Sequence, residues 1–295
     1  MVPNFILGGA MKSGTTFLHS LLQNHPKIRI IDRNMDFSYF DDDRIFQRGK
    51  KWYIKLFSDI TTDLEKGVII GQTSADCNFN PGSVQRILAY NPDTKLIFVL
   101  RHPIDRAYSL YWHQYGMGRE FRRFESAIKM EPYLIKKSYY NFKHYSYLER
   151  SKYDTQFKEI VKIVPAENLL ILDFESLVSE TKSAINIVLE FLGLEKVKDL
   201  EELDFNNLPR NRAKIPTYHI IVIISYFFQR IGFVSFGRRI VNLFKKEVRP
   251  PKIKECTNNI LKEKLNDDIL FYAKIRQEFN KRINQEKTHY KNLEH

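Results

Sequence analysis

The segment GAMKSGTT at residues 9–16 has the residue types and spacing that most clearly indicate a functional site. The segment follows the apolar run at residues 5–7 and precedes a stretch whose apolar spacing is typical of a helix. In a strand, loop and helix unit of this kind, successive backbone N–H groups and the helix N-terminus surround a phosphate. The segment therefore predicts an anion-binding loop.

This loop differs from the nucleoside-triphosphate pattern at one position. That pattern has a lysine directly after its second glycine, where this chain has Thr15, and the lysine stands two residues before the glycine, as Lys12. The next strong apolar run, residues 95–100, ends in Arg101, where triphosphatases carry an acidic Mg²⁺ ligand. Because an arginine repels a divalent cation and attracts a second phosphate, the sequence predicts a nucleotide with two separate anionic ends and no metal.

Two segments resemble those of a known enzyme family. Residues 6–26 are similar to the 5′-phosphosulfate loop of the sulfotransferases that use 3′-phosphoadenylyl sulfate (PAPS), and residues 96–113 resemble their 3′-phosphate segment. Residues 153–194 are more weakly similar to the carbohydrate, heparan-type branch and its bacterial relatives. The resemblance implies an enzyme that transfers a sulfonate group from PAPS to an acceptor hydroxyl and releases 3′-phosphoadenosine 5′-phosphate (PAP).

The resemblance also implies which residues bind the nucleotide. The 3′-phosphate would contact Arg101 and Ser109, and Pro103 suits the first position of the helix that carries Ser109. Arg210 lies in a short basic segment similar to the loop that closes over the nucleotide, with a solvated charge cluster as the alternative. The 5′-phosphosulfate would be bound by Lys12, Ser13, Gly14, Thr15 and Thr16.

Sulfonate transfer requires a stabilised leaving group and an acceptor hydroxyl that loses its proton. Lys12 suits the first task, since it can offset the charge that grows on the departing phosphate. Asp36 stands where heparan-type enzymes have a glutamate base, although neighbouring Asp32 and Asp41–Asp43 also fit an acidic, solvated loop. His113 is the second candidate base, with aromatic packing as its more common role.

Strands and helices alternate along most of the chain. Apolar runs predict strands at 5–7, 28–31, 68–70, 95–100 and 169–172, and helical spacing predicts helices at 15–25 and 181–192. This order predicts an α/β, three-layer P-loop-like fold with a central, mostly parallel sheet, in which ligands bind at the carboxyl ends of the strands. We expect this domain to span residues 1–212, with a C-terminal helical extension at 213–292 packed on it. Residues 293–295 resemble the remnant of a purification tag.

The composition favours an anionic partner. The chain has 295 residues, with 47 Lys and Arg against 35 Asp and Glu, which gives a formal net charge of +12. Cys77 and Cys256 form no disulfide or zinc pattern, and the first residues lack the features of a secretory signal. The sequence thus predicts a cytoplasmic protein. It carries no nucleic-acid reading motif, and it gives no indication of oligomeric state.

Two other functions compete with this interpretation. One is a nucleotide-dependent kinase with a degenerate loop, and the other is a basic module that binds membranes or nucleic acid. The apolar residues 220–228 are too few to span a bilayer, which takes about 20. Residues 218–239 are predicted to form a helix packed on the main domain, with peripheral membrane contact as the alternative. The sequence does not distinguish between a glycan, a lipid alcohol and other alcohols as the acceptor.

Overall fold

The computed structural model describes residues 3–31, 38–57, 67–198, 213–216, 218–248 and 250–293. The chain divides into two compact units, each assembled from separate stretches of sequence. The first unit contains Met1–Arg101, Tyr153–Pro209 and Leu270–His295, and the second contains His102–Lys152 and Arg210–Ile269. The predicted domain at 1–212 included residues 102–152, which in the structure group with 210–269.

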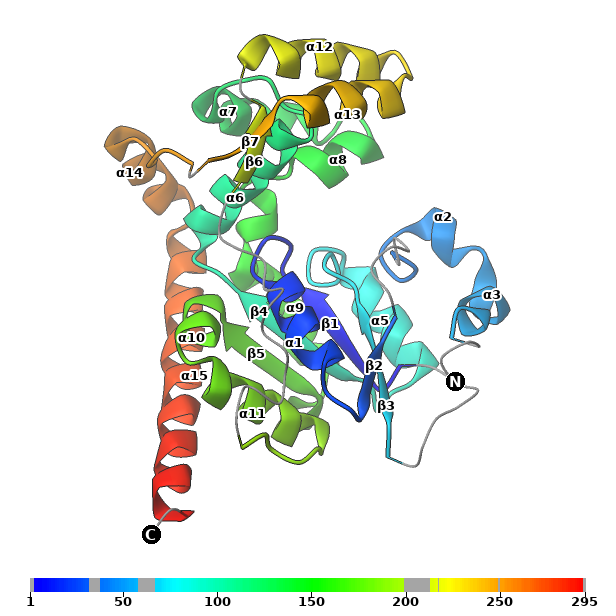
Figure 1. Cartoon of the computed structure of the whole chain (residues 1–295), viewed down its shortest axis with the longest axis vertical. Helices are drawn as coiled ribbons and strands as arrows, with labels where there is room; N and C mark the ends of the chain where they lie inside the picture. The colour runs from blue at the N-terminus through cyan, green and yellow to red at the C-terminus, as the bar shows by residue number, and fades with distance from the viewer. Residues whose placement is uncertain are drawn as a thin grey trace. The chain divides into compact units, whose positions relative to one another are not determined.

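The first unit is built on a five-stranded parallel sheet (Figure 1). Its spatial order is β2-β3-β1-β4-β5, and every described pairing between neighbours is parallel. The α/β fold with a central parallel sheet is therefore confirmed. The strands are β1 (Phe5–Gly9), β2 (Ile28–Ile30), β3 (Ile69–Thr73), β4 (Lys95–Leu100) and β5 (Leu169–Asp173).

Helices cover both faces of this sheet, because alternate strand residues point into two separate cores. Leu7, Ile97 and Val99 belong to a core shared with α1 (Thr15–Gln23), α10 (Phe174–Ser179), α11 (Thr181–Leu192) and the part of α15 (Asn266–Leu293) that follows Ile269. Phe98 and Leu100 belong to the other core. That core contains residues of α5 (Pro81–Tyr90) and α9 (Tyr153–Ile163), and the short helices α2 (Asp43–Phe46) and α3 (Gly49–Lys55) contribute to it as well. These two cores make the three layers that the sequence predicted.

Local sequence signals set the ends of these helices. Gly193 ends α11 in the left-handed conformation, with φ of 77°, as its position after the apolar repeat predicted. Asn80 caps α5 by accepting a hydrogen bond from the Gly82 N–H at 3.2 Å, and Pro81 occupies the first turn. The expected strands and helices of this unit are all found, with ends that differ by at most three residues.

The second unit is mainly helical. The predicted C-terminal helices are present, and residues 245–248 also pair with residues 213–216 as two antiparallel strands that sequence patterns did not indicate. No described helix is long and apolar enough to cross a membrane. The elements are α6 (Pro103–Gly116), α7 (Phe124–Leu134), α8 (Tyr139–Tyr145), β6 (Ala213–Pro216), α12 (His219–Arg230), α13 (Val234–Leu243), β7 (Lys245–Val248) and α14 (Glu255–Lys264).

A fully buried arginine organises the interior of this second unit. The Arg106 side chain of α6 has none of its surface exposed. Its Nε donates to Ser151 Oγ at 2.7 Å, and its guanidinium also donates to the carbonyl oxygen of Tyr147. Ser151 in turn donates to the carbonyl oxygen of Pro103 at 2.8 Å, so these bonds join the start of α6 to the chain around residue 150.

Candidate functional site

The loop between β1 and α1 has the backbone shape of an anion-binding turn. Gly14 has φ of 98°, and Lys12 has φ of 70°, which is uncommon for a residue with a side chain. Alternation of left- and right-handed conformations turns successive N–H groups toward one side of a loop. Gly14 is also the N-cap of α1 and carries no side chain that could accept from the first helical N–H groups. This backbone shape fits the anion-binding loop that the sequence predicted, and the binding itself stays a prediction.

Buried neighbours fix this loop in place. Ser13 is fully buried, and its hydroxyl lies 3.4 Å from that of Tyr153 at the start of α9. A β-carbon at Gly9 would overlap with the side chain of Asn78, and one at Gly14 would overlap with the ring of Phe174. At both positions a larger residue would clash with a neighbouring side chain, and the positive φ also favours glycine.

Arg101 stands next to this loop at the same edge of the sheet. The Ala10 N–H donates to the Val99 carbonyl at 2.8 Å, so the loop leaves β1 beside the end of β4. The Arg101 guanidinium lies over the Phe174 ring, 5.2 Å from its centroid. Among the described residues its buried Nε has no hydrogen-bond acceptor, and the Glu175 carboxylate lies 4.0 Å away. This donor fits an anionic oxygen of a bound ligand.

The turn after β5 holds Phe174 and Glu175 against Arg101. Leu100 pairs with Asp173 in the sheet, which puts Arg101 and Phe174 one residue beyond paired positions. The buried Asp173 carboxylate accepts from the Ser176 N–H at 2.8 Å and from its hydroxyl at 2.6 Å, which caps α10. No sequence pattern indicated a role for Phe174, whose ring lies against both Gly14 and Arg101.

Tyr272 of α15 contacts the carboxylates of this turn. Its hydroxyl group is within hydrogen-bonding distance of both Asp173 and Glu175. Burial and the two carboxylates raise the pKa of Tyr272, so the hydroxyl stays protonated and donates at neutral pH. Burial also raises the pKa of Glu175 above its ordinary value, and nearby Asp173 adds to that rise.

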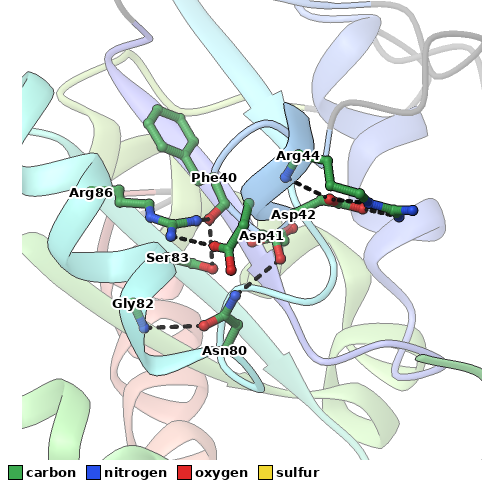
Figure 2. Close-up of polar contacts among 9 residues, drawn as sticks. Phe40, Asp41, Asp42, Arg44, Asn80, Gly82, Ser83 and Arg86 are labelled. Atoms are coloured by element: carbon green, nitrogen blue, oxygen red, sulfur yellow. Dashed lines mark hydrogen bonds and ion pairs between the residues drawn. The ribbon is translucent and has the colours of Figure 1, made fainter. Parts of the chain in front are cut away.

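The segment that follows Asp36 in sequence is anchored to the end of β3. Ser74, directly after β3, donates its hydroxyl hydrogen to the Asp41 carboxylate. Figure 2 shows that Asn80 and Ser83 reach the backbone of the same segment, where they donate to the carbonyl oxygens of Asp41 at 2.9 Å and Phe40 at 3.1 Å. Because β3 pairs with β1, this segment lies on the side of the phosphate loop opposite Arg101.

Burial distinguishes the acidic residues of this segment. Asp41 and Asp42 are 7% and 3% exposed, and Asp42 caps α2 by accepting from the Arg44 N–H at 3.0 Å. The idea of a uniformly solvated acidic loop is therefore wrong for these two residues, because each carboxylate has donors that offset its desolvation. Asp43 has a side chain that is 75% exposed and does fit that idea. Asp36 lies outside the described residues.

The predicted site residues are distributed over both compact units. Lys12, Ser13, Gly14, Thr15, Thr16 and Arg101 all follow the carboxyl ends of β1 and β4 in the first unit. Ser109 and His113 are on α6 of the second unit, which begins at Pro103 as predicted. They are four residues apart, so they share one face of that helix. Arg210 lies outside the described residues, and the roles of all these residues stay predictions.

Comparisons with known proteins agree with this geometry. The membrane-associated sulfotransferase kil1 of Dictyostelium discoideum is 38% identical over 110 residues, which cover 37% of this chain and 22% of kil1. The heparan sulfate glucosamine 3-O-sulfotransferase 3B1 of Mus musculus is 28% identical over 207 residues, which cover 70% of this chain and 50% of that protein. The chain thus spans half or less of the length of these two curated relatives.

Solved structures and a family model complete the comparison. The crystal structure of a sulfotransferase from Alicyclobacillus acidocaldarius superimposes with a TM-score of 0.58 at 24% identity, over 82% of this chain and 96% of that one, which shows the same fold. The model of the sulfotransferase domain family matches residues 3–222, about three quarters of the chain. The chain therefore belongs to the sulfotransferase domain family.

Proposed function

We propose that this protein transfers a sulfonate group from PAPS to the hydroxyl of an acceptor, without a metal ion. The observation that carries the proposal is the convergence of two cationic segments at one edge of the sheet. The glycine loop with Lys12 leaves β1, and Arg101 leaves the adjacent strand β4 with a buried Nε that has no hydrogen-bond acceptor among the described residues. A nucleotide with a 5′-phosphosulfate and a separate 3′-phosphate has the matching pair of anionic groups.

The residues of the first unit then have distinct tasks. The backbone N–H groups at residues 12 and 14–16 bind the 5′-phosphosulfate, and the α1 N-terminus adds its favourable dipole. The Ser13 N–H instead donates to the Ala10 carbonyl at 3.1 Å and closes the loop. Lys12 offsets the negative charge that develops on the phosphate oxygen when its bond to sulfur breaks. Arg101 binds the 3′-phosphate, and Ser109 adds a hydroxyl donor. Phe174 is a positioning residue, since its ring supports the Arg101 guanidinium and packs against Gly14.

The acceptor approaches from the β3 side of the loop. We propose Asp36 as the general base that takes the hydroxyl proton as the oxygen attacks sulfur. The described chain resumes at Ser38, two residues later, and Asp41 is held there by Ser74 at the end of β3. A glycan is the proposed acceptor class, because relatives such as the heparan sulfate glucosamine 3-O-sulfotransferase 3B1 of Mus musculus carry a glycan in their name. A screen of glycan and other alcohol acceptors with radiolabelled sulfonate donor tests the reaction and the acceptor together.

We predict that PAP binds about ten- to a hundredfold more tightly than adenosine 5′-phosphate, because the added 3′-phosphate gains charge-assisted hydrogen bonds from Arg101. Isothermal calorimetry with both nucleotides, with and without a chelator, measures the difference. Arg101→Ala should weaken PAP binding by about tenfold or more and leave adenosine 5′-phosphate binding nearly unchanged. Equal affinity for the two nucleotides in the unchanged protein, or loss of PAP binding in chelator, would contradict the proposal.

Phe174→Ala should weaken PAP binding by about three- to tenfold, since the Arg101 guanidinium loses the ring beneath it. Phe191→Ala is the matched control, because the ring of Phe191 lies 5.2 Å from the Lys95 ammonium in the same arrangement, at the start of β4. We expect the control to lower the melting temperature without changing PAP affinity. If both variants bind PAP equally well, Phe174 has only a packing role.

We also propose that the protein acts in a reducing compartment such as the cytoplasm. Its two cysteines are both free, with Cys77 buried and Cys256 exposed. Burial raises the pKa of the Cys77 thiol well above its ordinary value, which keeps this thiol protonated and unreactive. Fluorescence microscopy of the full chain in its source cells tests the location.

A further inference from the structure

Helix α12 has apolar side chains on two opposite faces. One face packs inside the second unit, where Val222 and Ser225 are fully buried. The Ser225 hydroxyl donates to the Gly237 carbonyl of α13 at 2.8 Å, and a β-carbon at Gly237 would lie 2.7 Å from the Ser225 carbonyl oxygen. Gln229 donates to the Met117 carbonyl at 2.9 Å. Close packing through small residues therefore joins α12 and α13 into a helical hairpin, visible in yellow and orange in Figure 1.

The opposite face of α12 is apolar and exposed. Its side chains follow the spacing i, i+3, i+4, i+7 and i+11, which forms one stripe along a helix. Phe227 is 60% exposed, Phe233 at the turn between the helices is 61% exposed, and Leu243 of α13 is 75% exposed. The stripe consists of Ile220, Ile223, Ile224, Phe227 and Ile231. So many large apolar groups on one surface mark an interaction site in a folded protein.

The charged residues of the segment that carries this surface all have the same sign. From Phe205 to Lys246 the sequence contains no aspartate or glutamate, although the whole chain has 35 of them. The residues from 218 to 246 carry five basic side chains, namely Arg230, Arg238, Arg239, Lys245 and Lys246. Two copies of such a surface would repel each other, whereas an anionic surface would be attracted. The combination of an apolar stripe with basic residues matches the boundary between lipid headgroups and acyl chains.

We propose that residues 218–246, the α12–α13 hairpin, bind peripherally to the surface of bilayers that contain anionic phospholipids. The 12 residues of α12 measure about 18 Å along the helix axis, against about 30 Å for the hydrocarbon core, so the hairpin lies in the interface rather than crossing it. The exposed stripe and Phe233 enter the boundary of the acyl chains, and the basic residues contact the phosphate groups. This binding is independent of sulfonate transfer.

Vesicle sedimentation of the full chain tests the proposal directly. We expect the protein to pellet with phosphatidylcholine vesicles that contain about 30% phosphatidylserine, and to pellet less at high salt because the phosphates are then screened. Arg238→Gln with Arg239→Gln should weaken this partitioning by about tenfold or more. Phosphatidylcholine vesicles alone should bind the unchanged protein more weakly than the anionic vesicles.

A pair of double variants isolates the apolar stripe. Ile224→Asp with Phe227→Asp puts two carboxylates on the stripe and should abolish pelleting with anionic vesicles. Tyr133→Asp with Val161→Asp is the matched control, since these side chains are 67% and 55% exposed outside the hairpin. We expect the control to bind vesicles like the unchanged protein. Circular dichroism and thermal melting of both variants establish that they remain folded.

A fluorescent variant gives a second, independent measurement. Phe233→Trp adds a tryptophan at the turn of the hairpin, and vesicles with brominated acyl chains should quench its emission. Tyr133→Trp, outside the hairpin, should show no added quenching. The proposal is overturned if the unchanged protein fails to pellet with anionic vesicles, or if both double variants pellet equally well. It is also overturned if light scattering finds a dimer that only Ile224→Asp with Phe227→Asp dissociates, while no form binds vesicles.

Discussion

Replacing Lys12 by alanine should lower kcat for sulfonate transfer by about 10²–10³-fold, because the variant loses the positive charge that offsets the departing phosphate. The affinity for PAP should change much less, since the backbone donors of the loop and Arg101 still bind its two phosphates. A contact that strengthens only as charge develops acts on kcat rather than on ground-state binding. Single-turnover rates with PAPS, together with calorimetry with PAP, separate the two effects.

Lys12→Arg is the control for this experiment, since it keeps the charge in a larger and more rigid group. It should recover part of the rate that alanine loses. The opposite pattern, in which Lys12→Ala weakens PAP binding as strongly as it lowers kcat, would make Lys12 an anchor for the nucleotide and remove its role in the transition state.

Asp36→Asn should lower the rate of transfer to the true acceptor by about 10²-fold or more, because asparagine keeps the shape of the side chain but accepts no proton. PAP affinity should stay close to that of the unchanged protein, since Asp36 is not among the residues proposed to bind the nucleotide. The measurement is the rate of labelled product formation with the acceptor found by screening, alongside calorimetry with PAP.

Asp43→Asn is the matched control, because it changes the same group seven residues away on an exposed side chain. It should leave both rate and affinity unchanged. Near-normal transfer by Asp36→Asn would place the base elsewhere, and His113 on α6 would be the next residue to change. The result would leave the family assignment intact, since that rests on the match over residues 3–222.

The sequence predicted the strand, glycine loop and helix at the start of the chain well because everything that defines them is local. A buried apolar strand, a run of small residues and a helix follow one another within residues 5–23, and Gly14 adopts the backbone conformation that its residue type permits. The sequence also showed that Arg101 stands at the end of β4, where triphosphatases have an acidic residue. This position could be predicted because the end of a strand has a fixed place at the edge of a parallel sheet.

The support of the site could not be predicted in the same way. Phe174 reads in sequence as an ordinary apolar residue, and only the pairing of β4 with β5 brings its ring under Arg101 and against Gly14, 160 positions away. Asp41 reads as solvated, and its burial is accompanied by a hydrogen bond from Ser74, which follows β3 and is 33 residues away in sequence.

The sequence by itself determined the order of elements, the phosphate loop and the apolar character of residues 220–228. Helix periodicity and turn residues act over a few neighbours, so they can be read without knowing the fold. The tertiary structure decided which face of α12 is covered by α13, where Ser225 donates to the Gly237 carbonyl, and which face is left exposed. The hydrophobicity of a residue is a property of its side chain and can be read from the sequence. Its exposure depends on which elements pack against it, and such packing joins residues that no local sequence pattern connects.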